Sequence, residues 1–279
     1  MAAYDLAATF QAFLDAVNSK NWDQVEERIS PTVTATYGEK QESRDELISR
    51  FIVSAKEGDQ LSADTWTVNQ ATQSVATRLI TSIKNTLEAE GTPSRVWDLV
   101  LVFFEEGRIS RFYQVASQVS RDPQFGPWAP EITSEPSKNP LSISQIDEEY
   151  RKYLYSFNDG TMPAAVLQGW AKEVSVLGNK LPREAVPNLF SKVIVPVIAG
   201  LKCEVEEMVI DVRKQQIAVR LAIEGVPENK NLQKDGEGKK VKVYEHAMYG
   251  FEEGKIAWVW AAQAYNSTPP SGWEASSVP

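Results

Sequence analysis

The stretch Phe104-Glu105-Glu106-Gly107-Arg108-Ile109 recurs almost unchanged as Phe251-Glu252-Glu253-Gly254-Lys255-Ile256. In each copy a Glu-Glu-Gly turn separates two apolar runs, which is the pattern of a β-hairpin. The sequence around the first copy also recurs around the second, in the same order and about 140 residues later. Solenoid repeats are only about 20–50 residues long, so this period indicates two copies of a whole domain.

An aromatic helix pattern opens each half of the chain. Its members are Phe10, Phe13, Leu14 and Val17 in the first half and Tyr150, Tyr153, Leu154 and Phe157 in the second. The spacing i, i+3, i+4, i+7 places each set on one face of an amphipathic helix. An asparagine follows each set, Asn18 and Asn158. We expect both faces to be core, with the hydroxyl of Tyr150 or Tyr153 able to reach a pocket.

Within each half, helical patterns precede strand patterns. In the first half, helices are expected over Leu6–Asn18, from Trp22 to Pro31, and after the S-x-x-E capping box of Ser43 and Glu46. The expected strands cover 32–37, 64–69, 75–85, 95–104 and 108–115, then 174–177, 203–211, 216–225, 240–251 and 255–263. Helices followed by a meander of antiparallel strands predict an α+β fold with the helices on one face of each sheet.

A proline-rich stretch separates the two halves. Residues 118–144 hold prolines among Ser, Asp and Gly without a sustained period, which is typical of a linker. We therefore expect a first domain over 1–117, a linker over 118–144, a second domain over 145–266 and a disordered tail over 267–279. A chain of 279 residues is long enough for two domains of about 100–150 residues each.

The composition is that of an ordinary globular protein, with 42% hydrophobic and 24% charged residues. A net charge of −9 repels phosphate backbones, which argues against nucleic acid as a partner. The single cysteine, Cys203, excludes an intramolecular disulfide, and the N-terminus lacks the order of a signal peptide. No apolar run approaches the ~20 residues of a membrane span. We expect a cytoplasmic protein that binds no membrane.

The segment Tyr244–Ile256, followed by Val259-Trp260, resembles the C-terminal signature of SnoaL-like proteins that are common in fungi. Together with the helix pattern, it makes each half similar to the NTF2-like superfamily. The resemblance implies two cone folds in tandem, each with helices on a strongly curved antiparallel sheet around an apolar pocket. Because NTF2-like domains dimerise sheet against sheet, we expect the tandem to form a pseudo-dimer within a monomeric chain.

The chain departs from this family at two motifs. Fungal SnoaL-like proteins often carry a His-Asn-Gly-type motif after the first strand, where this chain has Thr36-Tyr37-Gly38 and Leu177-Gly178-Asn179. They also often place an Asp after the final strand, where this chain has Ser117 and Ala264. The standard site of the family is therefore not expected here.

Acid–base chemistry by a buried carboxyl group is the chemistry that the sequence leaves open. A single histidine cannot build a His-rich metal site, so we expect neither a metal nor a cofactor. Glu245 and His246 are the leading catalytic candidates, and their adjacency on a strand places them on opposite faces. The family resemblance favours Glu245, whereas a one-residue bulge would favour His246. In the alternative interpretation, Glu245 fixes a loop and His246 lies between the domains.

Asp98 occupies the position of Glu245 in the first half, within an otherwise apolar strand. It is interpreted either as a catalytic acid or as a core carboxylate with satisfied hydrogen bonds. Polar and aromatic residues near these strands are the expected substrate contacts. They are Tyr37, Trp97, Arg111, Tyr113, Arg220, Tyr249, Trp258 and Trp260.

Two functions are compatible with these residues. The first is a cofactor-independent isomerase, cyclase or dehydratase, or a pericyclase, acting on a hydrophobic polyketide or terpenoid intermediate of secondary metabolism. The pocket would fold the substrate into a reactive shape, and Glu245 or Asp98 would move a proton. The second is a non-catalytic carrier of a lipophilic ligand, or an NTF2-like module for protein interaction.

Overall fold

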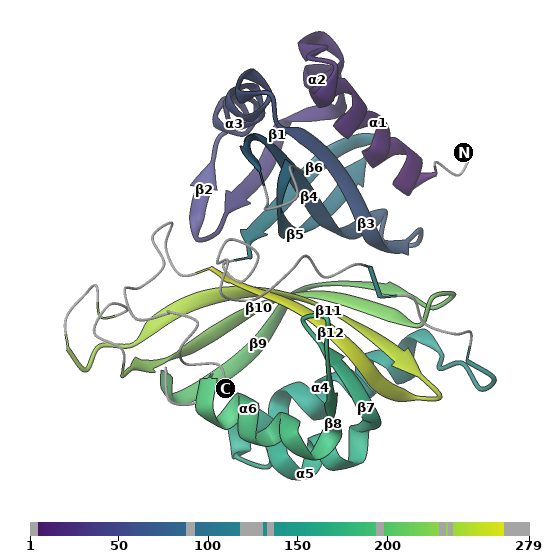
Figure 1. Ribbon diagram of the computed structural model, residues 1–279, viewed down its shortest axis with the longest axis vertical. Helices are drawn as coiled ribbons and strands as arrows, with labels where there is room; N and C mark the ends of the chain where they lie inside the picture. The colour runs from purple at the N-terminus through teal and green to yellow at the C-terminus, as the bar shows by residue number, and fades with distance from the viewer. Residues whose placement is uncertain are drawn as a thin grey trace.

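The computed structural model describes residues 5–87, 93–117, 131–132, 137–193, 198–228, 233 and 237–264. They form two α+β domains whose sheets face each other, with the helices on the outer sides (Figure 1). The first domain consists of α1 (Leu6–Asn18), α2 (Trp22–Arg28), β1 (Ile29–Tyr37), β2 (Lys40–Glu42), α3 (Arg44–Glu57), β3 (Gln60–Asn69), β4 (Ser74–Leu87), β5 (Pro93–Glu105) and β6 (Arg108–Ala116). The second consists of α4 (Ile143–Asp159), α5 (Met162–Gly169), β7 (Trp170–Val176), β8 (Asn179–Pro182), η3 (Arg183–Ala185), α6 (Val186–Val193), β9 (Ile198–Asp211), β10 (Gln216–Pro227), β11 (Val241–Glu252) and β12 (Lys255–Ala264).

The two sheets have the same topology. Their strand orders are β2-β1-β6-β5-β4-β3 and β8-β7-β12-β11-β10-β9, so each strand of the first sheet has a counterpart in the second. In both sheets the first strand runs parallel to the last, and the other pairs are antiparallel. The predicted fold class, two α+β cone folds in tandem, is confirmed.

The repeated hexapeptide forms the turn of the β5–β6 and β11–β12 hairpins. Glu106 and Gly107 have φ angles of 51° and 77°, and Glu253 and Gly254 have 47° and 76°. Positive φ at both central residues is the geometry of a type I′ turn, which glycine accommodates without strain. Each hairpin then shifts register by one residue a short distance from the turn. Such bulges bend and twist strands, which favours a curved sheet.

The asparagine after each aromatic helix ties that helix to the edge strand of its sheet. Asn18 Oδ1 accepts from Leu61 N at 2.8 Å and its Nδ2 donates to Leu61 O at 2.7 Å. Asn158 makes the same two bonds with the backbone of Cys203, at 2.6 and 3.1 Å. The side-chain amide thus replaces the neighbouring strand that an edge residue lacks.

The central strands of each sheet are buried on both faces. On β5, Val100 and Val102 point into the core of the first domain, whereas Leu99 and Leu101 belong to a third core between the two sheets. The same alternation holds on β11, where Met248 lies in this third core. The expected sheet-to-sheet pseudo-dimer is therefore what the described residues form.

Most predicted elements are present, and the differences concern short or polar segments. The strands β2 and β8 were not predicted, because three or four mostly polar, exposed residues give no alternating pattern. The helix α4 begins inside the proposed linker, at Ile143, and most of that linker and the whole tail over 267–279 lie outside the described residues. Within the described ranges, no helix has both the length and the apolarity of a membrane-spanning segment.

Candidate functional site

Glu245 lies on β11, on the face of the second sheet that the helices cover. Its neighbours on that face are Ala247, Tyr249 and Phe251, which belong to the core of the second domain. The side chain is 6% exposed, and Gln263 Nε2 donates a hydrogen bond to its Oε2 at 2.6 Å. Burial raises the pKa of Glu245 to about 7, because an apolar interior solvates a carboxylate poorly, and the bond from Gln263 opposes the rise.

Three tyrosine rings surround this region of the interior. Tyr150 and Tyr153 on α4 pack against Tyr249, with ring centroids 5.1 and 5.9 Å from it. Burial raises the pKa of each tyrosine above its ordinary value, so all three hydroxyls stay protonated. Burial also raises the pKa of the nearby Cys203 thiol to about 12. Among these groups, Glu245 is the one that titrates near neutral pH.

The corresponding carboxylate of the first domain, Asp98, has a different environment. Gln114 Nε2 donates to Asp98 Oδ2, and Gln114 Oε1 accepts from Arg50 Nη1 at 2.8 Å. Arg50 also forms a bidentate ion pair with Glu42, with N–O distances of 3.0 and 2.8 Å. The ring centroid of Tyr37 lies 4.7 Å from Arg50 Cζ. Two predicted site residues, Asp98 and Tyr37, therefore belong to one polar cluster inside the first domain.

The second domain lacks this polar cluster because its repeat-related positions are apolar. Glu42, Arg50 and Gln114 of the first domain correspond to Leu181, Leu189 and Ala261 of the second, which pack against its core. Neither a guanidinium nor the amide of the first domain is present to stabilise a charge on Glu245. The raised pKa of Glu245 follows from these replacements, since desolvation is then opposed by a single hydrogen bond.

His246 lies on the opposite face of β11, between the two sheets, and is fully buried. Arg220 Nη1 is 3.1 Å from its Nε2, and Leu99 O is 2.9 Å from its Nδ1. Arginine can only donate, so Nε2 accepts and Nδ1 carries the proton that bonds to the first domain. Burial, and then the charge of Arg220, lowers the pKa of His246 to about 3. The neutral imidazole thus occupies the interdomain position that the alternative interpretation expected.

Most of the expected substrate contacts also pack between the sheets. They are Trp97, Arg111, Tyr113, Arg220, Trp258 and Trp260. Arg220 Cζ lies 4.9 Å from the ring centroid of Tyr113, and Arg78 Cζ lies 4.3 Å from that of Trp260. These two contacts are related by the repeat, so the interface has approximate twofold symmetry. Tyr249 is the expected substrate contact that shares an interior with Glu245.

Gln263, the hydrogen-bond donor to Glu245, was not predicted as a site residue. Counting outward from the Glu253-Gly254 turn pairs Glu245 with Ala262, but the register shift after Phe251 moves the partner to Gln263. The bulge leaves no residue signature in the hairpin, so this pairing requires the structure.

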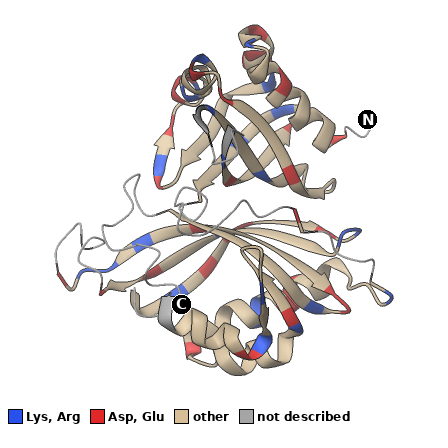
Figure 2. Ribbon diagram, viewed as in Figure 1, with Lys and Arg blue, Asp and Glu red and all other residues tan. Residues whose placement is uncertain are grey.

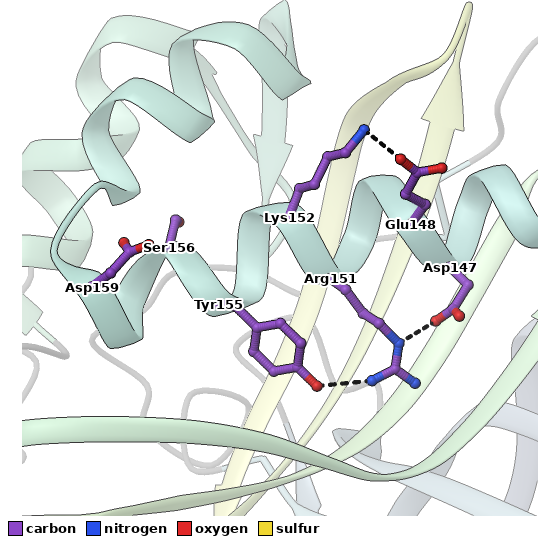
Figure 3. Close-up of a pocket in the computed structure, with 7 residues that line it drawn as sticks. All are labelled: Asp147, Glu148, Arg151, Lys152, Tyr155, Ser156 and Asp159. Carbon is purple, nitrogen blue, oxygen red and sulfur yellow. Dashed lines mark hydrogen bonds and ion pairs between the residues drawn. The ribbon is translucent and has the colours of Figure 1, made fainter.

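A depression of about 510 Å³ lies on the outer side of α4, away from both interiors (Figure 3). Arg151 Nε pairs with Asp147 Oδ1 at 2.6 Å, and Lys152 Nζ with Glu148 Oε1 at 2.9 Å, all on this one helix. Exposed pairs of this kind contribute little to stability. Over both domains, Lys and Arg are interspersed with Asp and Glu (Figure 2). The described residues include no His, Cys, Asp or Glu cluster that could hold a metal ion.

Neither a protein-family model nor a curated protein matches the sequence. Several solved structures are similar to part of the chain. A SnoaL-like polyketide cyclase from Agrobacterium tumefaciens is 25% identical over 42% of this chain and 90% of its own, with a TM-score of 0.36. IdmH, a putative polyketide cyclase from Streptomyces antibioticus, is 15% identical over 42% and 95%, with a TM-score of 0.37. AclR, a putative hydroxylase from Streptomyces galilaeus, is 13% identical over 44% and 90%, with a TM-score of 0.36.

Proposed function

We propose that this chain is a cofactor-independent enzyme that isomerises, cyclises or dehydrates a hydrophobic polyketide or terpenoid intermediate of secondary metabolism. It would act in the cytoplasm as a monomer, with Glu245 as the proton-transferring group. One observation carries the proposal. Glu245 is a buried carboxyl group with a pKa of about 7, placed among aromatic rings and without an ion pair in the described part of the chain.

A carboxyl group with this pKa suits both directions of proton transfer. Near neutral pH, the protonated and ionised forms of Glu245 are both well populated, so the same group serves as general acid or general base. The surrounding hydroxyls and thiol hold their protons and do not compete for this role. Apolar walls add orientation, because a substrate held in a reactive conformation loses less entropy on reaching the transition state.

The first domain is assigned a supporting role in this proposal. Its interior is filled by phenylalanine rings, with Phe13 and Phe51 at a centroid distance of 5.3 Å and Phe112 at 5.8 Å from Phe51. Its carboxylate, Asp98, is engaged by Gln114. The first sheet covers the outer face of the second and keeps β11 buried on both sides.

The alternative is a non-catalytic carrier of a lipophilic ligand, or a protein-interaction module. The close packing of rings in the second domain favours it. The ring centroid of Tyr153 lies 5.2 Å from that of Trp170 and 5.6 Å from that of Phe157, which are contact distances between packed aromatic rings.

The test begins with metabolite profiling of a deletion strain. Any intermediate that accumulates is then incubated with the purified wild-type protein, with Glu245→Gln and with the matched control Asp98→Asn. The proposal expects conversion by the wild type and by Asp98→Asn, and a rate about 10²- to 10⁴-fold lower for Glu245→Gln. Binding of the intermediate without conversion by any of the three proteins would establish the carrier instead.

A further inference from the structure

Each domain provides a glutamine to its interior carboxyl group, but from a different position on its last strand. In the first domain, Gln114 Nε2 donates to Asp98, whereas the residue directly opposite Asp98 is Ala116. In the second domain, Gln263 lies directly opposite Glu245 and donates to it at 2.6 Å. At the repeat-related position of each glutamine, the other domain has an alanine. The amide partner is therefore present in both domains, although the position that supplies it differs.

The side chain of Gln263 turns toward the interior although it is only half-buried. As a direct cross-strand pair, Gln263 and Glu245 leave the same face of the sheet. A half-buried glutamine could instead extend into water, and holding it inward costs rotamer entropy. A hydrogen bond to an ionised acceptor is about twice as strong as one to a neutral acceptor. The contact therefore offsets this cost best when Glu245 is a carboxylate.

The amide N–H gives the two oxygen atoms of Glu245 different roles. Because Oε2 accepts from Gln263, a proton on that same oxygen would point a second hydrogen toward the donor. The neutral acid therefore carries its proton on Oε1. As a general acid, Glu245 breaks its Oε1–H bond and becomes a carboxylate, whose charge the N–H of Gln263 stabilises. As a general base, it takes the proton back onto the same oxygen.

We infer that Gln263 is the positioning residue of Glu245, with its amide on Oε2 and the exchangeable proton on Oε1. This inference rests on the proposed function, because it assigns Gln263 a task in proton transfer by Glu245. It deepens that function by naming the oxygen atom that reacts and a residue that adjusts its acidity.

The surroundings of Glu245 make this contact measurable. Among the described residues, the titratable groups that face it are Tyr150 and Tyr153 on α4, Tyr249 on β11 and Cys203 on β9. Burial raises the pKa of each above its ordinary value, so all four stay protonated while Glu245 titrates. The pKa of Glu245 itself is raised by burial and lowered by the bond from Gln263. A change at Gln263 should therefore appear directly in this titration.

The experiment measures the titration of Glu245 in the full-length protein without any ligand. Protein labelled with isotope-enriched glutamate gives an NMR signal for the side-chain carboxyl carbon, and Glu245→Gln identifies that signal by its loss. The wild type is expected to titrate with a midpoint near pH 7. Gln263→Met keeps the length of the side chain but removes the donor. It should raise the midpoint by about one pH unit, because the carboxylate form then loses a hydrogen bond.

Two further variants support this measurement. Gln263→Ala copies the residue that the first domain has at the corresponding position, and it should raise the midpoint in the same direction. Gln145→Met is the control, since Gln145 belongs to the same domain but caps α4, where its Oε1 accepts from Ser142 N at 2.8 Å. This control should leave the midpoint of Glu245 unchanged. Under the proposed function, the pH dependence of kcat/KM should move with the midpoint in Gln263→Met, which a purely structural loss would not produce.

An unchanged or lowered midpoint in both Gln263→Met and Gln263→Ala would overturn the inference, even if turnover still required Glu245. A pH dependence of kcat/KM that stays fixed while the midpoint rises would overturn it as well. The proposed function fails separately. A raised midpoint in Gln263→Met, together with unchanged turnover by Glu245→Gln, would refute the catalytic role of Glu245 and leave Gln263 as the residue that adjusts its titration.

Discussion

The two domains share one backbone plan but treat their matched carboxylates in opposite ways. In the first, Asp98 accepts from Gln114, which in turn binds Arg50 of the Arg50–Glu42 ion pair. In the second, Glu245 is left with one amide in an apolar interior. Strand order and turns preserve the cone in both domains, whereas a few side chains inside it decide which hydrogen-bond partners the carboxyl group meets.

Among the substitutions that test this comparison, Arg50→Leu should cause the largest loss of stability. It places in the first domain the leucine that the second domain carries at the corresponding position. It leaves Glu42, whose side chain is 6% exposed, without its cation. Removing one partner of a buried pair costs about 3 kcal/mol or more, because the other charge stays desolvated. Urea unfolding monitored by circular dichroism measures the loss.

The matched control for Arg50→Leu is the double variant Glu42→Leu with Arg50→Leu, which reproduces both leucines of the second domain. We expect it to recover most of the lost stability, since replacing a whole buried pair with apolar residues is often nearly neutral. If the double variant is as unstable as the single one, the ion pair is not what distinguishes the two interiors.

The next effect is the dependence of stability on pH. The pKa of Glu245 is raised from an ordinary 4.5 to about 7 in the folded state, so the folded protein binds this proton more tightly than the unfolded chain. The contribution of Glu245 to the free energy of unfolding is therefore complete below its ordinary pKa and is lost as the pH rises toward 7. Between these two pKa values the free energy of unfolding should decrease by roughly 3 kcal/mol.

This pH dependence is isolated by comparing wild type with Glu245→Gln in urea titrations at about pH 4, 6 and 8. Other titrating groups contribute equally to both proteins and cancel in the difference. The variant should gain stability relative to the wild type as the pH rises. A constant difference across the series would mean that the carboxyl group titrates at its ordinary pKa.

A smaller loss of stability is expected at Gly250. At this position the second domain has a small residue where the first has a large one. Gly250 corresponds to Phe103, and its neighbour Trp258 corresponds to Arg111, which stacks on Phe103 at 3.7 Å. A Cβ at residue 250 would lie 1.9 Å from Trp258 Nε1, inside a buried ring. Gly250→Ala should therefore cost about 1–3 kcal/mol, as overpacked cores do.

Gly169→Ala is the control for this substitution, because a Cβ there meets no atom within 4 Å. It should be neutral or slightly stabilising, since alanine restricts the unfolded chain more than glycine. Thermal unfolding of both variants gives the comparison. Equal behaviour of the two would show that Trp258 moves aside without cost.

The smallest losses of stability are expected at a contact that both domains share. Asn18→Ala and Asn158→Ala each remove a pair of bonds to the backbone of an edge strand. Each should lose about 1–2 kcal/mol, the cost of leaving partly buried backbone groups without partners. Unequal losses, measured by urea unfolding, would show that the two cones do not share this contact energetically.

Much of the fold was predictable because its signals are local. The helix at Leu6–Asn18 and the capping box at Ser43 match the structure, since helix spacing and caps depend on residues a few positions apart. The short strands β2 and β8 were missed because a hairpin of three or four polar residues has no such period. The partner of Glu245 was missed because a bulge shifts the register by one residue.

The sequence by itself determined that a domain occurs twice, that helices precede a meander of strands, and that Asp98 and Glu245 occupy the same place in it. The tertiary structure alone decided which neighbours each carboxyl group meets and which face of β11 lies inside the cone. The physical reason is that the central strands of each sheet are buried on both faces, one under helices and one against the other sheet. Apolar residues then line both faces, so alternation along a strand cannot distinguish an interior from an interface.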